Sequence, residues 1–169
     1  MRITIVVMGV AGCGKTTIGK AIAGRLGLGF VDGDDVHSPE AVAKMSAGQP
    51  LTDDDRWPWL DRIGDLLKDK SRFPDGLVVA CSALRKRYRD RLRAASSSGL
   101  RFIFLEGSIG LIRSRMAARS GHYMPPSLLE SQFAALEPPL GEPGTAIISI
   151  IDRPDEIAAD SLAWLSVNT

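Results

Sequence analysis

Residues 3–16 read ITIVVMGVAGCGKT, an apolar, β-branched run that passes directly into a glycine-rich segment. A short run of this kind is typical of a parallel strand that is buried on both faces. Downstream, Ile18, Ile22 and Leu26 recur at the spacing of one helix face. Gly27 follows at the position where a C-cap glycine is expected. The stretch therefore predicts a strand, a glycine loop and a helix in direct succession.

The rest of the chain repeats this alternation. Besides residues 3–8, we expect strands at 29–31, 77–81, 101–105 and 146–150, which are short and nearly all apolar. Further helices are expected at 53–70, 84–95, 109–119, 127–136 and 156–165. This pattern predicts an α/β fold, a doubly wound parallel sheet of about five strands in a three-layer α/β/α arrangement. A ligand site is then expected at the carboxyl ends of the strands.

The composition is that of one soluble globular domain over residues 1–169, with 44% hydrophobic and 24% charged residues. The net charge of +1 lacks the basic excess typical of nucleic-acid-binding proteins. No apolar run approaches the roughly 20 residues that cross a bilayer, and the opening run is typical of a buried strand rather than of a signal peptide. Cys13 and Cys81 are the only cysteines and lie far apart, which favours a reducing, cytoplasmic setting. We expect neither nucleic acid nor a membrane as a partner.

Residues 9–16 match the pattern G-x-x-x-x-G-K-[ST] at every fixed position, between the expected strand and the expected helix. Glycines let the backbone wrap closely around an anion, and successive N–H groups at a helix N-terminus point at a phosphate. We expect Lys15 to bridge the β- and γ-phosphates and the Thr16 hydroxyl to bind Mg²⁺. The predicted nucleotide-binding residues are Gly9, Val10, Ala11, Gly12, Cys13, Gly14, Lys15, Thr16 and Thr17.

The nucleotide is expected to be ATP. A GTPase normally recognises guanine with an N-K-x-D sequence, and the only asparagine here is Asn168. Asp61 and Gly64 match the D-x-x-G switch pattern, but they fall inside an expected helix rather than at a strand end. ATP binding is thus favoured over a GTP-dependent switch.

Carboxylates follow the second expected strand, beside the glycine loop. Asp32 is placed to hold a water of the Mg²⁺ shell, and Asp34 is placed to orient an acceptor hydroxyl and take its proton. The alternative is that these acidic residues cap the next helix, since Asp35 and Ser38 are suitable N-cap residues.

Three further blocks run in order along the chain: FVDGDDVHSPEAVAKMSAGQPLTDDDRWPWL (30–60), VVACSALRKRYRDRLR (78–93) and GHYMPPSLLESQFAALEPP (121–139). Together with the phosphate loop they resemble the gluconate kinase (gluconokinase) family of small P-loop carbohydrate kinases. Shikimate kinases are similar at the F-x-D-x-D step but lack the H-x-P-x-x-x-x-K-M and D-D-x-R-x-x-W-L blocks. The resemblance implies transfer of the γ-phosphoryl group of ATP to the 6-hydroxyl of D-gluconate. It also implies a mobile lid, placed at about residues 119–138, and often a homodimer.

Gluconate is a polyol with one carboxylate, so its site needs hydroxyl partners and a cation. Asp34 and His37 suit the hydroxyls, and His37 is assigned to substrate contact rather than to catalysis. Lys44 and Arg56 are the candidates for the carboxylate, and the planar guanidinium fork favours Arg56. Taken alone, Arg56 would pair with an acid of its own helix, such as Asp53.

Two basic segments lie further along the chain. Residues 85–93 contain six Lys or Arg; Arg85 is expected at the acceptor pocket and the others are expected to be structural. Arg115 and Arg119, one helical turn apart, are candidates for stabilising the transferred phosphoryl from the lid. The alternative is a helix C-terminus enriched in cations. Gln132 is a further candidate for substrate contact.

The predicted catalytic residues are therefore Lys15, Asp34, Arg115 and Arg119. Two other functions stay open: a kinase that acts on shikimate or another sugar acid, and a nucleotide-binding regulator that transfers no phosphate. A regulator needs no carboxylate on the acceptor side, so Asp34 argues against it.

Overall fold

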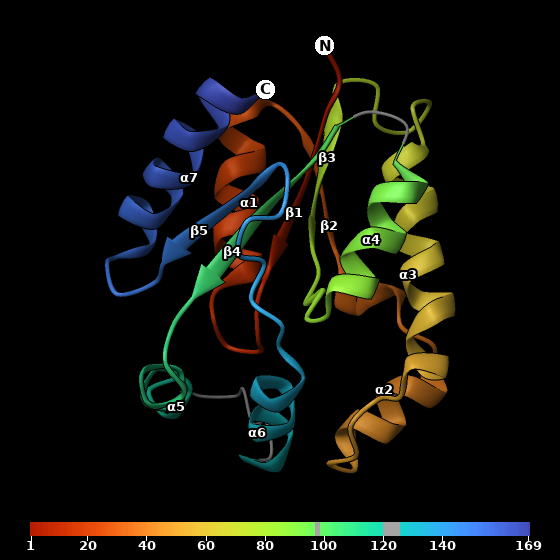
Figure 1. Ribbon diagram of the computed structural model, residues 1–169, viewed down its shortest axis with the longest axis vertical. Helices are drawn as coiled ribbons and strands as arrows, with labels where there is room; N and C mark the ends of the chain where they lie inside the picture. The colour runs from red at the N-terminus through yellow and green to blue at the C-terminus, as the bar shows by residue number, and fades with distance from the viewer. Residues whose placement is uncertain (97–98, 120–125) are drawn as a thin grey trace.

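Five parallel strands form the centre of the structure, a computed structural model that describes residues 1–96, 99–119 and 126–169. The strands are β1 (Ile3–Met8), β2 (Gly29–Asp32), β3 (Gly76–Ala80), β4 (Leu100–Glu106) and β5 (Thr145–Ser149). They are hydrogen-bonded in the order β2-β3-β1-β4-β5, and every pair is parallel (Figure 1). The predicted doubly wound α/β fold is confirmed.

Helices connect the strands. They are α1 (Lys15–Leu26), α2 (Pro39–Ser46), α3 (Asp53–Lys68), α4 (Lys86–Ala95), α5 (Ile109–Ala117), α6 (Pro126–Ala135) and α7 (Pro154–Asn168), with a 3₁₀ turn η1 at Gly33–Val36. Each predicted helix is present, with ends that differ by up to three residues. Gly27 ends α1 in the left-handed conformation, at φ 67°, as expected.

The sequence analysis missed α2 and η1. The signal for α2 was present, because Ser38 caps it: the Ser38 hydroxyl accepts a hydrogen bond from the Ala41 N–H at 3.1 Å, and Pro39 occupies the first turn. Asp35 lies inside η1, so the suggestion that it caps a helix is wrong. The cap of η1 is Asp32, whose side chain accepts from the Asp34 N–H.

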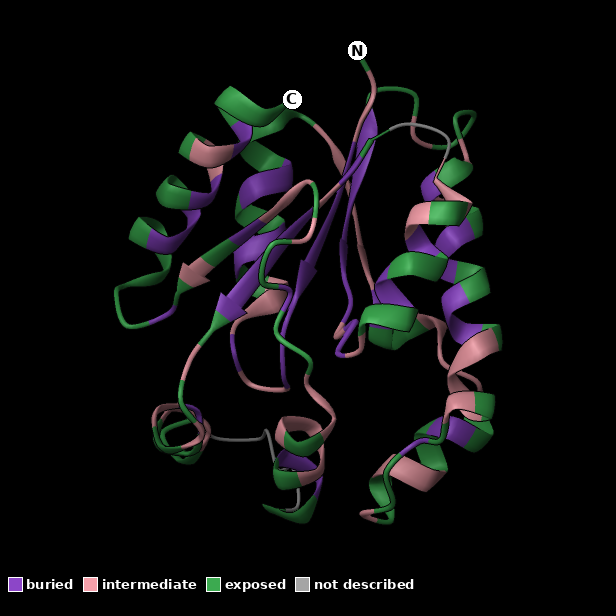
Figure 2. Cartoon of the chain, viewed as in Figure 1, coloured by how far each residue is buried: buried purple, intermediate pink, exposed green. Residues whose placement is uncertain are grey.

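Two apolar cores cover the faces of the sheet. Ile5 and Val7 of β1 pack in the core shared with α1 and α7, whereas Val6 and Met8 pack in the core shared with α3 and α4. The inner strands β1, β3 and β4 are mostly buried, and the outward faces of the helices are exposed (Figure 2). Burial on both faces explains why the strands are continuously apolar rather than alternating.

The carboxyl ends of the strands carry the remaining elements. In Figure 1 the strand arrows point toward α2, α5 and α6, which lie beyond this edge of the sheet. The glycine loop after β1 and η1 after β2 begin at the same edge. The expected ligand site is therefore surrounded by the segments that the sequence analysis singled out. None of the helices described here is long and apolar enough to span a bilayer.

Candidate active site

The glycine loop between β1 and α1 is built to hold an anion. Gly9, Gly12 and Gly14 have φ values of 147°, 78° and 99°, which non-glycine residues rarely adopt. A Cβ on Gly9 would lie 2.7 Å from Cys13 Sγ, so this position also has no room for a side chain. Gly14 precedes α1 without a side-chain cap, which leaves the first N–H groups of the helix open to a ligand.

Lys15 is held over this loop. Its Nζ donates a hydrogen bond to the Val10 carbonyl at 2.9 Å, so the ammonium group lies against the glycine loop. Val10 and Cys13 are buried, and burial raises the pKa of the Cys13 thiol. Their contribution to nucleotide binding would therefore come from the backbone.

Thr16 and Asp32, which the sequence analysis assigns to Mg²⁺, are in direct contact. The Thr16 hydroxyl donates to Asp32 Oδ2 at 2.7 Å, and Asp32 Oδ1 accepts from the Asp34 N–H at 3.0 Å. A hydroxyl and a carboxylate are the hard oxygen ligands that Mg²⁺ prefers. Within the described part of the chain, no group of three or more His, Cys, Asp or Glu could hold a metal by itself. The donors therefore fit Mg²⁺ that is shared with waters and phosphates.

A cavity of about 820 Å³ opens beside the glycine loop. Of the predicted site residues, it is lined by Ala11, Gly12, Gly14, Lys15, Thr16, Thr17, Asp32, Asp34, His37, Arg56, Arg85, Arg119 and Gln132. The remaining ones, Gly9, Val10, Cys13, Lys44 and Arg115, do not line it. The fold thus brings most of the predicted residues together from α1, η1, α3, α6 and the segments next to α4 and α5.

Asp34 lies in η1 and lines the cavity. Burial is the largest influence on this carboxyl group and raises its pKa above the ordinary value of 3.8. The positive charge of Lys15 lowers the pKa, while the neighbouring carboxylates Asp32 and Asp35 raise it. A carboxylate with a raised pKa near the positive charge of Lys15 has the properties of a general base.

Of the three described residues with a buried side-chain nitrogen that lacks a hydrogen-bond partner, His37 and Arg56 line the cavity and Arg93 does not. The atoms of the two cavity residues are His37 Nδ1 and Arg56 Nε. The His37 ring stacks on Trp59 with ring centroids 4.1 Å apart. Burial, followed by the charges of Arg56 and Arg62, lowers the pKa of His37 to about 4, so the imidazole is neutral at pH 7.

The two candidate cations for the substrate carboxylate differ in their surroundings. Lys44 Nζ binds Asp55 at 2.7 Å and lies outside the cavity lining. Arg56 lines the cavity, with its guanidinium 5.5 Å from the centroid of the Tyr88 ring. The pair between Arg56 and Asp53 that the sequence left open does not form, because Asp53 accepts hydrogen bonds from Tyr88 and Arg87 instead.

Only some of the predicted lid residues line the cavity. Arg119 lines it, whereas Arg115 Nη2 donates to the Ile151 carbonyl at 3.2 Å. Gln132 lines it too, but its Oε1 accepts from the Ala11 N–H at 2.7 Å, so this side chain contacts the phosphate loop. Residues 120–125 of the expected lid lie outside the described part of the chain.

Sequence reasoning missed several cavity residues, among them Thr52, Asp53, Ser82 and Tyr88. Asp53 and Tyr88 lie within the blocks that carried the resemblance, but their side chains have many structural uses. Only the packing of α3 beside α4 shows that they face the same cavity.

Known proteins are similar to this chain in sequence and in fold. The shikimate kinase family model matches residues 11–135. A gluconokinase of Gluconobacter oxydans (strain 621H) is 44% identical over 153 residues, which cover 90% of this chain and 85% of the relative. The chain belongs to the gluconokinase family. A second member, the thermosensitive gluconokinase of Escherichia coli (strain K12), is 45% identical and is matched over 80% of this chain and 72% of its own.

Solved structures agree with this membership of the gluconokinase family. A gluconokinase from Sinorhizobium meliloti 1021 has a TM-score of 0.91 at 47% identity, covering 98% of this chain and 94% of that one. The APS kinase of Mycobacterium tuberculosis has a TM-score of 0.68 at 17% identity, which shows a shared fold and nothing more. The predicted family and fold are confirmed.

Proposed function

We propose that this member of the gluconokinase family transfers the γ-phosphoryl group of ATP to the 6-hydroxyl of D-gluconate, giving 6-phospho-D-gluconate and ADP. The observation that carries the proposal is one cavity lined both by the phosphate loop and by Asp34, His37 and Arg56. Buried polar atoms are nearly always paired, so the unpartnered nitrogens of His37 and Arg56 support a polar ligand beside the phosphate site.

The nucleotide would be held by the glycine loop. Its backbone N–H groups and the N-terminus of α1 face the β-phosphate, and Lys15 exchanges the Val10 carbonyl for phosphate oxygens. Thr16 and Asp32 would hold Mg²⁺, directly and through water respectively. When bound, Mg²⁺ neutralises charge on the β- and γ-phosphates.

The acceptor would be activated by Asp34. A bond forms between O6 of gluconate and the γ-phosphorus, and the bond from that phosphorus to the β,γ-bridging oxygen breaks, leaving ADP. The hydroxyl proton passes to the Asp34 carboxylate. The raised pKa of Asp34 supports this role, because a more basic carboxylate accepts a proton more readily.

Arg56 is proposed to bind the carboxylate of gluconate. Its unpartnered Nε and its place in the cavity lining favour it over Lys44, whose charge is already matched by Asp55. The neutral imidazole of His37 would contact the hydroxyl groups of gluconate, and so would the guanidinium of Arg85. Gln132 is proposed to act through the phosphate loop that it contacts.

Arg119 is proposed to stabilise the charge on the transferred phosphoryl group. It lines the cavity and is exposed, so it is free to approach a bound nucleotide. Arg115 would have to release the Ile151 carbonyl to take part, which makes it the weaker of the two candidates.

The experiment is an assay of ADP release with Mg·ATP and a panel of acceptors: gluconate, shikimate, related sugar acids and none. Turnover with gluconate alone supports the proposal. Turnover with shikimate or another sugar acid in preference to gluconate would show that this compound, and not gluconate, is the acceptor. ATP binding without turnover on any acceptor would instead indicate a nucleotide-binding regulator.

A cytoplasmic setting and a homodimer are part of the proposal. The first is supported by the two cysteines, both of which are free and buried. The second rests on the family resemblance. Sedimentation equilibrium of the purified chain would distinguish a dimer from a monomer.

A further inference from the structure

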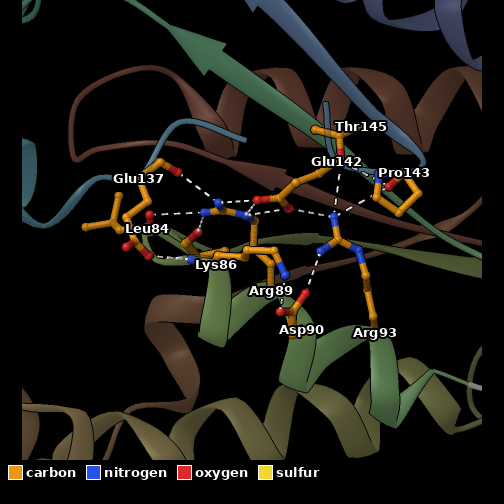
Figure 3. A network of polar contacts seen from close by, with 10 residues as sticks. Leu84, Lys86, Arg89, Asp90, Arg93, Glu137, Glu142, Pro143 and Thr145 are labelled. Atoms are coloured by element: carbon orange, nitrogen blue, oxygen red, sulfur yellow. Dashed lines mark hydrogen bonds and ion pairs between the residues drawn. The ribbon is translucent and has the colours of Figure 1, made fainter. Parts of the chain in front are cut away.

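Arg89 of α4 is fully buried, with 0% of its side chain exposed, and every N–H of its guanidinium is hydrogen-bonded (Figure 3). Nε contacts both carboxylate oxygens of Glu142, at 3.0 and 3.2 Å. Nη1 donates to the carbonyls of Ala83 and Leu84, at 2.8 and 3.0 Å. Nη2 donates to the Glu137 carbonyl at 2.8 Å and to Glu142 Oε1 at 2.6 Å.

These partners come from three separate segments. Ala83 and Leu84 belong to the loop between β3 and α4, directly between Ser82 and Arg85, which both line the cavity. Glu137 follows α6, the helix that carries Gln132. Glu142 precedes β5. One side chain therefore joins the wall of the acceptor pocket to the end of α6.

The loop that Arg89 holds is strained. Ala83 has a φ of 44°, and among the described residues it is the one non-glycine residue with a positive φ. Such a conformation persists only when its surroundings enforce it. The carbonyls of Ala83 and Leu84 are bound side by side to one nitrogen of Arg89, which supplies that enforcement.

Glu137 makes a second connection between the same two segments. Its N–H donates to the Leu84 carbonyl at 2.8 Å, and its Oε1 accepts from the Lys86 N–H at 2.8 Å. Lys86 is the first residue of α4, and the N-cap residue Arg85 provides no side-chain cap. A carboxylate from beyond α6 thus serves as the cap of α4.

We infer that Arg89 is a positioning residue of the reaction, which locks the strained loop of the acceptor pocket to the end of α6 so that Arg85 and Gln132 keep their relative places. The inference rests on the proposed function. Arg89 itself does not line the cavity, so it acts through the backbone that it binds. A buried ion pair is weak evidence for stability, whereas an arrangement that joins three segments in one geometry favours a role in specificity.

Arg93 offers a matched control. It also binds Glu142, at 2.8 Å, but no hydrogen bond joins it to the β3–α4 loop or to Glu137 among the described residues. Arg89→Lys keeps the charge beside Glu142 and loses the fork that binds the carbonyls. Arg93→Lys makes the same chemical change beside Glu142 but leaves the hydrogen bonds from Arg89 to the β3–α4 loop and to Glu137 in place.

The first experiment compares the kinetics of the two variants. We expect Arg89→Lys to raise the KM for gluconate about tenfold or more and to change the affinity for ATP less than about twofold. Arg93→Lys is expected to leave both within about twofold. Equal effects of the two variants, or a wild-type KM in a folded Arg89→Lys, would overturn the inference.

A second pair of variants covers the case in which Arg89→Lys does not fold. The Glu137 side chain is exposed, so its replacement threatens the fold little. Glu137→Ala removes the cap of α4 and should raise the KM for gluconate about threefold to tenfold. Glu137→Gln keeps an acceptor oxygen and should recover most of that loss. A normal KM for Glu137→Ala would contradict the inference.

Amide hydrogen exchange separates this inference from the proposed function, since it needs no acceptor. In Arg89→Lys, exchange of residues 83–88 and 132–137 should rise together, whereas in Arg93→Lys it should stay as in the wild type. If the wild type fails to phosphorylate gluconate, the proposed function is rejected while this exchange pattern still tests the connection. Exchange that rises in one segment alone would refute it.

Discussion

The indole Nε1 of Trp59 donates a hydrogen bond to the Gly33 carbonyl at 2.7 Å, in the buried core. The same ring stacks on His37. Gly33 has no room for a side chain, because a Cβ there would lie 2.5 Å from the Ala80 carbonyl oxygen. The turn that carries Asp34 is therefore fixed between β3 and α3.

Trp59→Phe tests whether the hydrogen bond from Trp59 to Gly33 anchors η1. The phenyl ring can keep the stack on His37, but the Gly33 carbonyl loses its donor, which costs about 1–3 kcal/mol for a buried acceptor. We expect a lower free energy of unfolding in urea and a kcat reduced about tenfold, because Asp34 is held less closely. Trp57→Phe is the control, since Trp57 packs edge-on against Tyr88 and, among the described residues, donates no hydrogen bond to η1. A Trp59→Phe enzyme with normal kcat would show that the anchor does not position Asp34.

Asp34→Asn removes the proposed base while keeping the size of the side chain. ATP affinity, measured by calorimetry, should be retained because the phosphate loop is unchanged. The kcat with gluconate should fall about 10²- to 10⁴-fold, the range for loss of a general base. Near-normal turnover would remove Asp34 from this role.

Arg56→Gln tests the assignment of the substrate carboxylate. Loss of a hydrogen bond to a charged group costs ~1.5–3 kcal/mol, so the KM for gluconate should rise roughly 10- to 100-fold. Lys44→Gln should change the KM for gluconate much less, because Lys44 lies outside the cavity lining and is paired with Asp55, a partly exposed carboxylate. A larger effect at Lys44 than at Arg56 would reverse the assignment.

The pH dependence of the free energy of unfolding should depend on the protonation of His37. Its pKa is about 4 in the folded state and 6.5 in the unfolded chain, so below pH 6.5 the unfolded chain binds a proton that the folded protein excludes. Stability from this group is therefore present above pH 6.5 and is lost as the pH falls toward 4. Asp34 acts in the opposite direction, because its folded pKa is raised.

Urea unfolding at several pH values between 7.5 and 4.5, for the wild type and His37→Gln, checks this prediction. The variant should lose less stability on acidification than the wild type does. Parallel curves for the two proteins would indicate that His37 titrates normally in the folded state.

The local signals along the chain were strong enough to predict most of the fold. The run into Gly9 and Lys15 predicted β1, the phosphate loop and α1, because a buried strand and a glycine turn are encoded by adjacent residues. The placement of Thr16 and Asp32 at one edge of the sheet could also be predicted, since both follow the carboxyl ends of parallel strands, although β3 lies between β1 and β2. The helix α2 was missed although Ser38 and Pro39 signalled its start, because its apolar periodicity is short.

The tertiary structure alone decided which partner each basic residue has. Arg85, Arg89 and Arg93 recur at a spacing of four residues, yet Arg85 is the N-cap of α4 and lines the cavity, whereas Arg89 lies within α4 and is buried against Glu142. The sequence named both Lys44 and Arg56 for the substrate carboxylate and favoured Arg56 for its planar guanidinium, and the structure adds that Asp55 is bound to Lys44. The physical reason is that hydrophobic pattern and turn chemistry act between near neighbours in the chain, whereas the partner of a charge is set by which distant segments the packed sheet brings to it.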